Sequence, residues 1–82
     1  MQRAKEFLEF IINNLVEDTN AIVIDAKTDE MGVLLTLSVA KEEMGKVIGR
    51  NGETAKAIRQ LLRAVGAQEN ARVSFKISEP VL

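Results

Sequence analysis

Two glycines interrupt a helical pattern in the segment Met44-Gly45-Lys46-Val47-Ile48-Gly49-Arg50-Asn51-Gly52-Glu53-Thr54-Ala55-Lys56-Ala57-Ile58-Arg59. Gly49 can adopt the positive φ that ends a short helix, and Asn51 is a candidate N-cap for a second helix. Gly52 leaves the first N–H groups of that helix without a side chain in front of them. Those groups and the positive end of the helix dipole suit a phosphate, and Arg50 adds positive charge. The segment therefore predicts two helices joined by a loop that can hold an anion.

The helix expected after Gly52 carries basic residues on one face. Positions spaced i+4, i+7 and i+11 from this glycine share that face, and all three are basic: Lys56, Arg59 and Arg63. Lys46 lies one turn before Gly49 and is expected near the loop. A solvated helix face alone accounts for such a stripe, and a tight turn alone accounts for the glycines. Their combination in one segment favours a binding site.

The apolar residues of the second helix indicate how it packs. Its apolar face is expected to contain Ile58, Leu61, Leu62 and Val65, and Gly66 is a natural stop just after it. Three aliphatic side chains near the loop are candidates for the floor of a ligand groove: Ile48, Ala55 and Ile58. The same three residues are equally suited to a core, and the pattern alone does not separate the two roles.

The residues before this segment predict one helix and two strands. From Arg3 to Val16, apolar residues recur with the i, i+3, i+4, i+7 spacing of an amphipathic helix. The β-branched residues within 21–27 indicate a strand, and the alternation within 33–39 indicates a second. The short connection between them implies an antiparallel hairpin. Glu42 and Glu43 suit the first turn of the short helix that precedes Gly49.

The residues after the basic helix complete the fold. Residues 72–78 alternate strictly, with Val73, Phe75 and Ile77 on one side, which is typical of a half-buried strand. The element order is therefore α-β-β-α-α-β, and the two-helix crossover makes the second and third strands parallel neighbours. We predict an α+β fold, a three-stranded mixed sheet with helices packed on one face. Residues 1–82 are expected to form a single domain with a short C-terminal tail at 79–82.

Positive charge is concentrated around the two glycines, although the chain as a whole has a formal net charge of −1. Residues 1–43 hold four basic and nine acidic side chains, a net charge of −5. Residues 44–63 hold five basic side chains against Glu53 alone, a net charge of +4. A locally basic region of this kind is suited to a polyanion.

Several residue types that carry chemistry are missing. The 82 residues include no cysteine, histidine, tyrosine or tryptophan, so the usual nucleophiles, general bases and metal ligands are mostly absent. We expect no enzyme, no cofactor and no metal site. No apolar run approaches the roughly 20 residues that cross a bilayer, and the N-terminus lacks the apolar stretch of a secretory signal. The expectation is a cytoplasmic protein without a membrane partner.

The run Val47-Ile48-Gly49-Arg50-Asn51-Gly52, with Ile58 downstream, resembles the signature of the KH domain. The element order matches the bacterial type II form, and the run from Val39 to Arg59 closely resembles the small bacterial KhpA-type KH proteins. The resemblance covers essentially the whole chain. Ala55 departs from the pattern, since many KH domains carry isoleucine there, which implies a roomier groove or weaker contacts with bases.

The resemblance implies a protein that binds single-stranded RNA. In KH domains the GxxG loop clamps the backbone of about four nucleotides, and the bases rest on an apolar groove. In this chain the resemblance assigns the phosphates to Gly49, Arg50, Asn51 and Gly52. It assigns nearby positive charge to Lys46, Lys56 and Arg59. It assigns the floor of the groove to Ile48, Ala55 and Ile58, with part of the third strand as the opposite wall. Arg63 extends the basic face. We expect weak, salt-sensitive, poorly selective binding, as in a post-transcriptional regulator or RNA chaperone.

The resemblance also implies protein partners. KhpA-type proteins are reported to self-associate and to pair with a larger KH/R3H-domain RNA-binding protein, so a homodimer or a heterodimer is expected. A module that keeps the KH fold only to bind other proteins is the main alternative function. Phe10 and Val16 lie off the main apolar stripe of the first helix and are candidates for such a surface.

Overall fold

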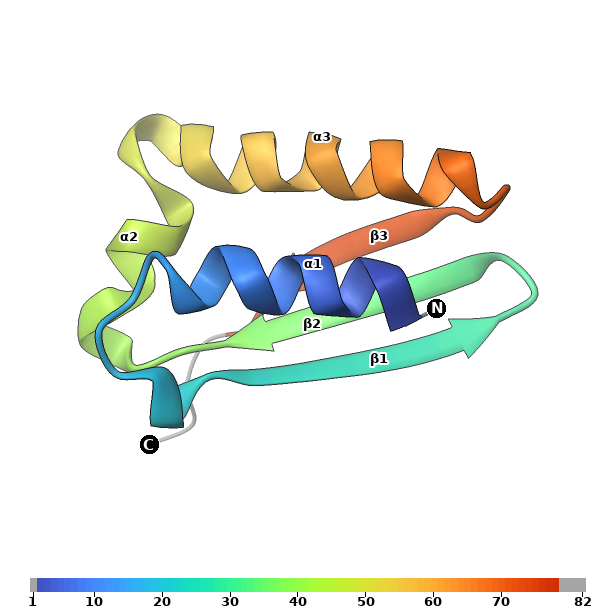
Figure 1. The fold of residues 1–82 in the computed structure, drawn as a ribbon. Helices are drawn as coiled ribbons and strands as arrows, with labels where there is room; N and C mark the ends of the chain where they lie inside the picture. The colour runs from blue at the N-terminus through green and yellow to red at the C-terminus, as the bar shows by residue number, and fades with distance from the viewer. Residues whose placement is uncertain (1, 79–82) are drawn as a thin grey trace.

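The chain forms its helices and strands in the order α1, β1, β2, α2, α3 and β3, the predicted α-β-β-α-α-β order (Figure 1). The computed structural model describes residues 2–78, and the tail expected at 79–82 lies outside these residues. The bounds are α1 Gln2–Asn13, β1 Val23–Asp29, β2 Gly32–Ser38, α2 Met44–Ile48, α3 Glu53–Gln68 and β3 Val73–Ile77. Three short 3-10 turns precede β1, α2 and α3: η1 Thr19–Ala21, η2 Lys41–Glu43 and η3 Arg50–Gly52. The predicted α+β fold is confirmed.

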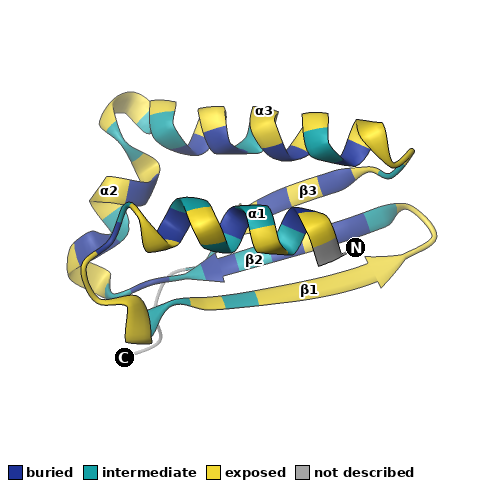
Figure 2. Cartoon of the chain, viewed as in Figure 1, coloured by how far each residue is buried: buried dark blue, intermediate teal, exposed yellow. Residues whose placement is uncertain are grey.

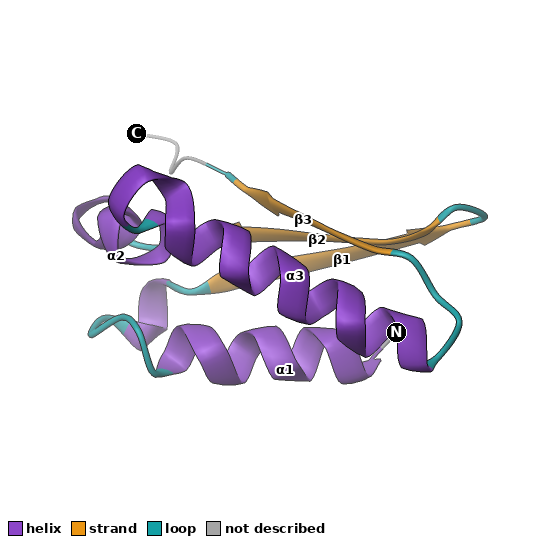
Figure 3. Ribbon diagram, turned by 90° about the horizontal axis from the view of Figure 1, so that it is seen from above, coloured by secondary structure: helices purple, strands orange, loops and turns teal. Residues whose placement is uncertain are grey.

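The central strand of the sheet is β2. It pairs with β1 in an antiparallel hairpin and with β3 in parallel. Leu35 lies opposite Ala26 of β1 and Phe75 of β3, so these three side chains face the same side of the sheet. Both α1 and α3 lie on that side (Figure 3). Among residues 2–78 no helix covers the other face, so the prediction of helices on one face is also confirmed.

The core fills the space between the two long helices and the sheet (Figure 2). Its buried side chains follow the predicted periodicities of α1 and of the two inner strand faces: Ala4, Leu8, Ile12, Val33, Leu35, Leu37, Val73 and Phe75. In α3 the buried residues are spaced by three or four: Ala55, Ile58, Leu62 and Gly66. Leu61 was expected on this face but is 49% exposed, because one residue turns the helix by about 100° from Leu62.

The first helix ends at Asn13, before the predicted limit at Val16. The N–H groups of Leu15 and Val16 still donate to the Ile12 carbonyl, at 3.0 and 3.1 Å, and the chain then bends toward the sheet. Val16 is only 6% exposed and belongs to the core. The prediction that Val16 lies on the surface is therefore wrong, because the helix ends at Asn13 and residue 16 no longer follows the helical spacing.

The basic helix α3 continues through Gly66, which was predicted to stop it. A Cβ at this position would lie 2.6 Å from the Ala71 carbonyl oxygen and 2.7 Å from Val73 Cγ2, so the glycine lets the returning chain approach the helix closely. The stop is at Asn70, which has a left-handed φ of 56°. The Ala71 N–H donates to the Gly66 carbonyl at 2.9 Å, as in a Schellman motif.

Candidate functional site

The loop between α2 and α3 has a left-handed backbone at three positions. The φ angles are 76° at Gly49, 55° at Asn51 and 76° at Gly52. Gly52 occupies the N-cap position of α3, and no side chain caps the helix there. The prediction that Asn51 caps α3 is wrong, because a capping side chain needs a β-region backbone. The Asn51 side chain is exposed, as is that of Arg50.

The two glycines of the loop have different reasons to be glycine. A Cβ on Gly49 would lie 2.6 Å from the Cβ of Thr54, whereas a Cβ on Gly52 would meet nothing within 4 Å. Packing therefore requires the first glycine, and the second leaves open space at the start of α3. That opening lies where the first N–H groups of the helix are directed.

A groove of about 590 Å³ lies between α3 and the edge strand β3. Its lining consists of Arg59, Arg63, Ala71, Arg72, Val73, Ser74 and Phe75. The Arg59 guanidinium carbon lies 5.9 Å from the centroid of the Phe75 ring, within the range of a cation–π contact. The structure thus brings the predicted residues Arg59 and Arg63 together with part of the third strand.

Arg72 is a basic residue of this groove that the spacing of residues does not predict. It directly precedes β3 and is exposed. Because α3 and β3 are consecutive elements joined by a short turn, the start of β3 returns beside the end of α3. A crossover of this kind is the signal that could have found Arg72, since it places the first residues of the strand next to Arg63.

The groove is positively charged and lacks a counter-charge. Its lining includes three arginines and no carboxylate. Within residues 2–78 the ion pairs involve Arg3 and Lys46, and none involves Arg59, Arg63 or Arg72. In an otherwise slightly acidic chain, this groove is the surface best suited to an anion.

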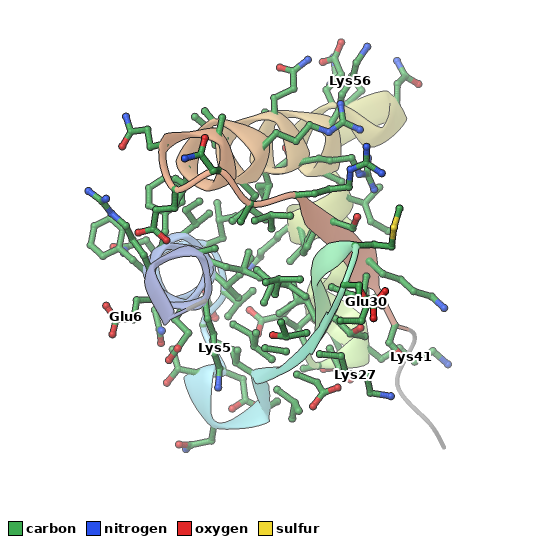
Figure 4. The ribbon with its side chains drawn as sticks, turned by 90° about the vertical axis from the view of Figure 1, so that its right-hand side faces the viewer. Lys5, Glu6, Lys27, Glu30, Lys41 and Lys56 are labelled. Carbon is green, nitrogen blue, oxygen red and sulfur yellow. The ribbon has the colours of Figure 1, made fainter. Side chains whose placement is uncertain are left out.

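The two lysines that were predicted to supply charge to the site, Lys46 and Lys56, do not line the groove. Lys46 of α2 is held by carboxylates, with its Nζ 3.2 Å from Glu43 Oε1 and 4.0 Å from Glu17 Oε1. Lys56 extends from α3 away from the sheet (Figure 4). Both can contribute to the local field, but the guanidinium groups supply the charge inside the groove.

The three aliphatic candidates separate into one surface residue and two core residues. Ile48 is 39% exposed at the end of α2. Ala55 and Ile58 are only 8% and 3% exposed, and Ile58 belongs to the core. Of the two roles left open by the pattern, packing accounts for Ala55 and Ile58, whereas Ile48 is available to a ligand beside the loop.

Glu43 has a structural role that its sequence position did not predict. The residue is only 7% exposed, and its carboxylate accepts hydrogen bonds from the N–H groups of Glu17 and Asp18 at 2.6 and 2.9 Å. These hydrogen bonds, followed by the charge of Lys46, lower the pKa of Glu43 despite partial desolvation. The carboxylate thus ties the segment after α1 to the helix that leads into the glycine loop.

The family model of the KhpA/KhpB KH domain matches residues 5–77. The chain belongs to the KhpA/KhpB KH-domain family. An RNA-binding protein KhpA from Chlamydia pneumoniae is 45% identical over 75 residues, covering 92% of this chain and 96% of that protein. One from Clostridium acetobutylicum is 42% identical over 73 residues, covering 89% and 97%. One from Borreliella burgdorferi is 39% identical over 72 residues, covering 88% of each chain.

Membership of the KhpA/KhpB family confirms the family predicted from the loop and agrees with the expectation that the chain is not an enzyme. Within residues 2–78, no helix is long and apolar enough to pass through a membrane. The same residues contain no group of His, Cys, Asp or Glu arranged to hold a metal ion.

Proposed function

We propose that this chain binds single-stranded RNA through the GxxG loop and the groove between α3 and β3. The observation that carries the proposal is the arginine groove without counter-charge, which begins two helical turns after an open, left-handed glycine loop. In this arrangement Gly49, Arg50, Asn51 and Gly52 hold backbone phosphates, as GxxG loops of KH domains do. The bases then lie between Ile48 and the groove wall.

The edge strand β3 supports this proposal because it offers backbone hydrogen-bonding groups. The Arg72 carbonyl accepts from Val33, and the Ser78 N–H donates to Leu37. In a parallel ladder alternate residues bond to the same neighbour, so the N–H and C=O groups of Val73 and Phe75 are directed away from β2. These donors and acceptors border the groove and are suited to the edges of unstacked bases.

The expected binding is weak and depends on salt. Phe75 is 6% exposed and does not present an open ring face, so stacking worth roughly 1–3 kcal/mol per base is forgone. Three or four phosphate contacts correspond to a log–log salt slope of about −2 to −3 for a single strand. We also expect low selectivity for the RNA sequence. Weak binding of low selectivity suits a cytoplasmic RNA chaperone or post-transcriptional regulator.

The test is fluorescence anisotropy with labelled single-stranded RNA at low salt. We compare the natural chain with the Arg50→Asp, Asn51→Asp double variant and expect that variant to lose binding about tenfold or more. The control is Lys27→Asp, on the side of the molecule opposite Lys56 (Figure 4), which changes the net charge without touching the site. Circular dichroism establishes that all three proteins are folded. Equal binding by the loop variant would contradict the proposal.

Self-association is a second proposed function, supported by two exposed apolar side chains of the helical layer. Phe10 of α1 is 69% exposed and Leu61 of α3 is 49% exposed, and the two helices pack beside each other. The partner in self-association is a second copy of the chain. The family resemblance also implies a heterodimer with a larger KH/R3H-domain protein. Two weak RNA sites joined in this way gain affinity through effective concentration.

A further inference from the structure

The groove between α3 and β3 continues beyond the residues that a GxxG loop needs. Arg63 lies eleven residues after Gly52, which corresponds to about 16 Å along a helix. The molecule is 35 Å in its longest dimension. A strand that leaves the loop along α3 therefore reaches Arg63 and Arg72 only after passing a large part of the molecule.

The end of the groove remote from the loop combines charges from two elements. Arg63 is exposed on α3, and Arg72 is exposed at the start of β3. Arg59, between this end and the loop, rests near the Phe75 ring. Guanidinium groups bind phosphate oxygens through paired N–H donors, so two of them on opposite walls can hold one phosphate between them.

The three arginines bring like charges to one groove. Within residues 2–78 none of them forms an ion pair, and the groove lining contains no carboxylate. A bound phosphodiester would supply the missing negative charge. Lys46, in contrast, is already held by Glu43 and Glu17.

We propose that Arg63 and Arg72 form a second phosphate site, which binds the backbone of single-stranded RNA beyond the roughly four nucleotides clamped by the loop. The inference rests on the proposed RNA-binding function and deepens it. The ligand group is a phosphodiester of the same strand that occupies the loop. The chain then distinguishes RNAs by length more strongly than by sequence.

The test compares oligouridines of about four and about ten nucleotides, the shorter matching one loop clamp. For the natural chain we expect tighter binding and a steeper salt slope with the longer RNA. Arg72→Gln is expected to weaken binding of the longer RNA by roughly fivefold to tenfold. It should reduce the slope by about 0.7 and leave the shorter RNA within about twofold.

The matched control is Lys76→Gln, which removes one positive charge from the same strand. Lys76 lies opposite Thr36 in the parallel register, is exposed and does not line the groove. It should leave the affinity for both RNAs unchanged. In the natural chain, NMR signals of the Arg63 and Arg72 Nε–H groups should shift with the longer RNA and not with the shorter one.

Two results with the Arg72→Gln variant would overturn the inference: a variant that keeps the natural length dependence, or one that binds both RNAs more weakly by the same factor. Unshifted Arg63 and Arg72 signals with the longer RNA would do the same without any variant. If the loop double variant loses RNA while the Arg72→Gln variant behaves as the natural chain, only this inference fails. If the loop double variant still binds, the proposed function itself fails.

Discussion

Glu43 binds two residues that are distant in the sequence, Glu17 and Asp18, which lie 26 and 25 residues before it. Its carboxylate accepts two N–H groups from the segment after α1 and pairs with Lys46, three residues further on in α2. Hydrogen bonds to the charged form lower the pKa of this carboxyl below its ordinary value of 4.5. A group with a lowered folded-state pKa adds stability above its unfolded pKa. That contribution is lost as the pH falls through the folded-state pKa.

We expect the free energy of unfolding of the natural chain to decrease as the pH falls below 4.5. The part of this decrease that is due to Glu43 should be absent from the Glu43→Gln variant. Denaturant unfolding between about pH 7 and pH 3 measures the difference. At neutral pH the Glu43→Gln variant should already be less stable than the natural chain. The control is Glu42→Gln, since Glu42 is the exposed neighbour. Equal pH dependence in both variants would rule out this role for Glu43.

The two loop glycines should respond differently to alanine. Gly52→Ala incurs only the left-handed backbone, about 1–2 kcal/mol, because nothing lies within 4 Å of the new Cβ. Gly49→Ala adds a collision with Thr54 and should cost about 2–4 kcal/mol. Gly45→Ala, in α2 with open space around it, serves as the control and should not destabilise. Unfolding midpoints in urea give the order, and a larger loss for Gly52→Ala would contradict it.

At the scale of the element, α3 separates its roles by face. One face packs on the sheet through Ile58 and Leu62, a second carries Arg59 and Arg63 into the groove, and Leu61 remains exposed. Periodicity predicts that this helix is amphipathic, and it correctly placed Ile58 and Leu62. It did not resolve Leu61, because the width of a buried face depends on how closely the helix approaches the sheet.

Neighbouring leucines of α3 therefore test the self-association proposal. Leu62→Ala should cost about 2–5 kcal/mol of stability, because the side chain is fully buried. Leu61→Ser should change the stability of the fold by less than about 0.5 kcal/mol and reduce the oligomer population. Static light scattering with denaturant unfolding separates the two effects. An unchanged molar mass for Leu61→Ser would remove Leu61 from the proposed interface.

At the scale of the whole molecule, patterns of residue type and spacing predict those features of the fold that depend on residues close together in the sequence. The hairpin, the parallel crossover, the inner strand residues Leu35 and Leu37 and the glycine loop all follow from spacing and residue type. The hairpin, the inner strand faces and the glycine loop each need only a few consecutive residues to be specified, and the crossover follows from the order of the elements. The sequence therefore predicted the fold and the family, and it placed Arg59 and Arg63 on the helix face that lines the groove.

Contacts between different elements account for what the patterns within single elements did not predict. Gly66 is glycine because Ala71 and Val73 approach it, and Glu43 is buried because the segment after α1 folds over it. Arg72 joins the groove only because β3 returns beside α3. The burial of Glu43 has no local signature, because its partners lie 25 and 26 residues away. For Gly66 and Arg72 the signal lies in the order of α3 and β3, and the spacing of apolar residues within either element does not contain it.

The edge position of β3 has a consequence for how this chain behaves at high concentration. An edge strand with unpaired backbone groups is a template for pairing with a strand of another molecule, which is a route to aggregation. Here Arg72 lies just before the strand and Lys76 lies within it, both exposed, so like charges would meet if two such edges approached. Arg72, which borders the groove, thus also protects the sheet, together with Lys76, from edge-to-edge association.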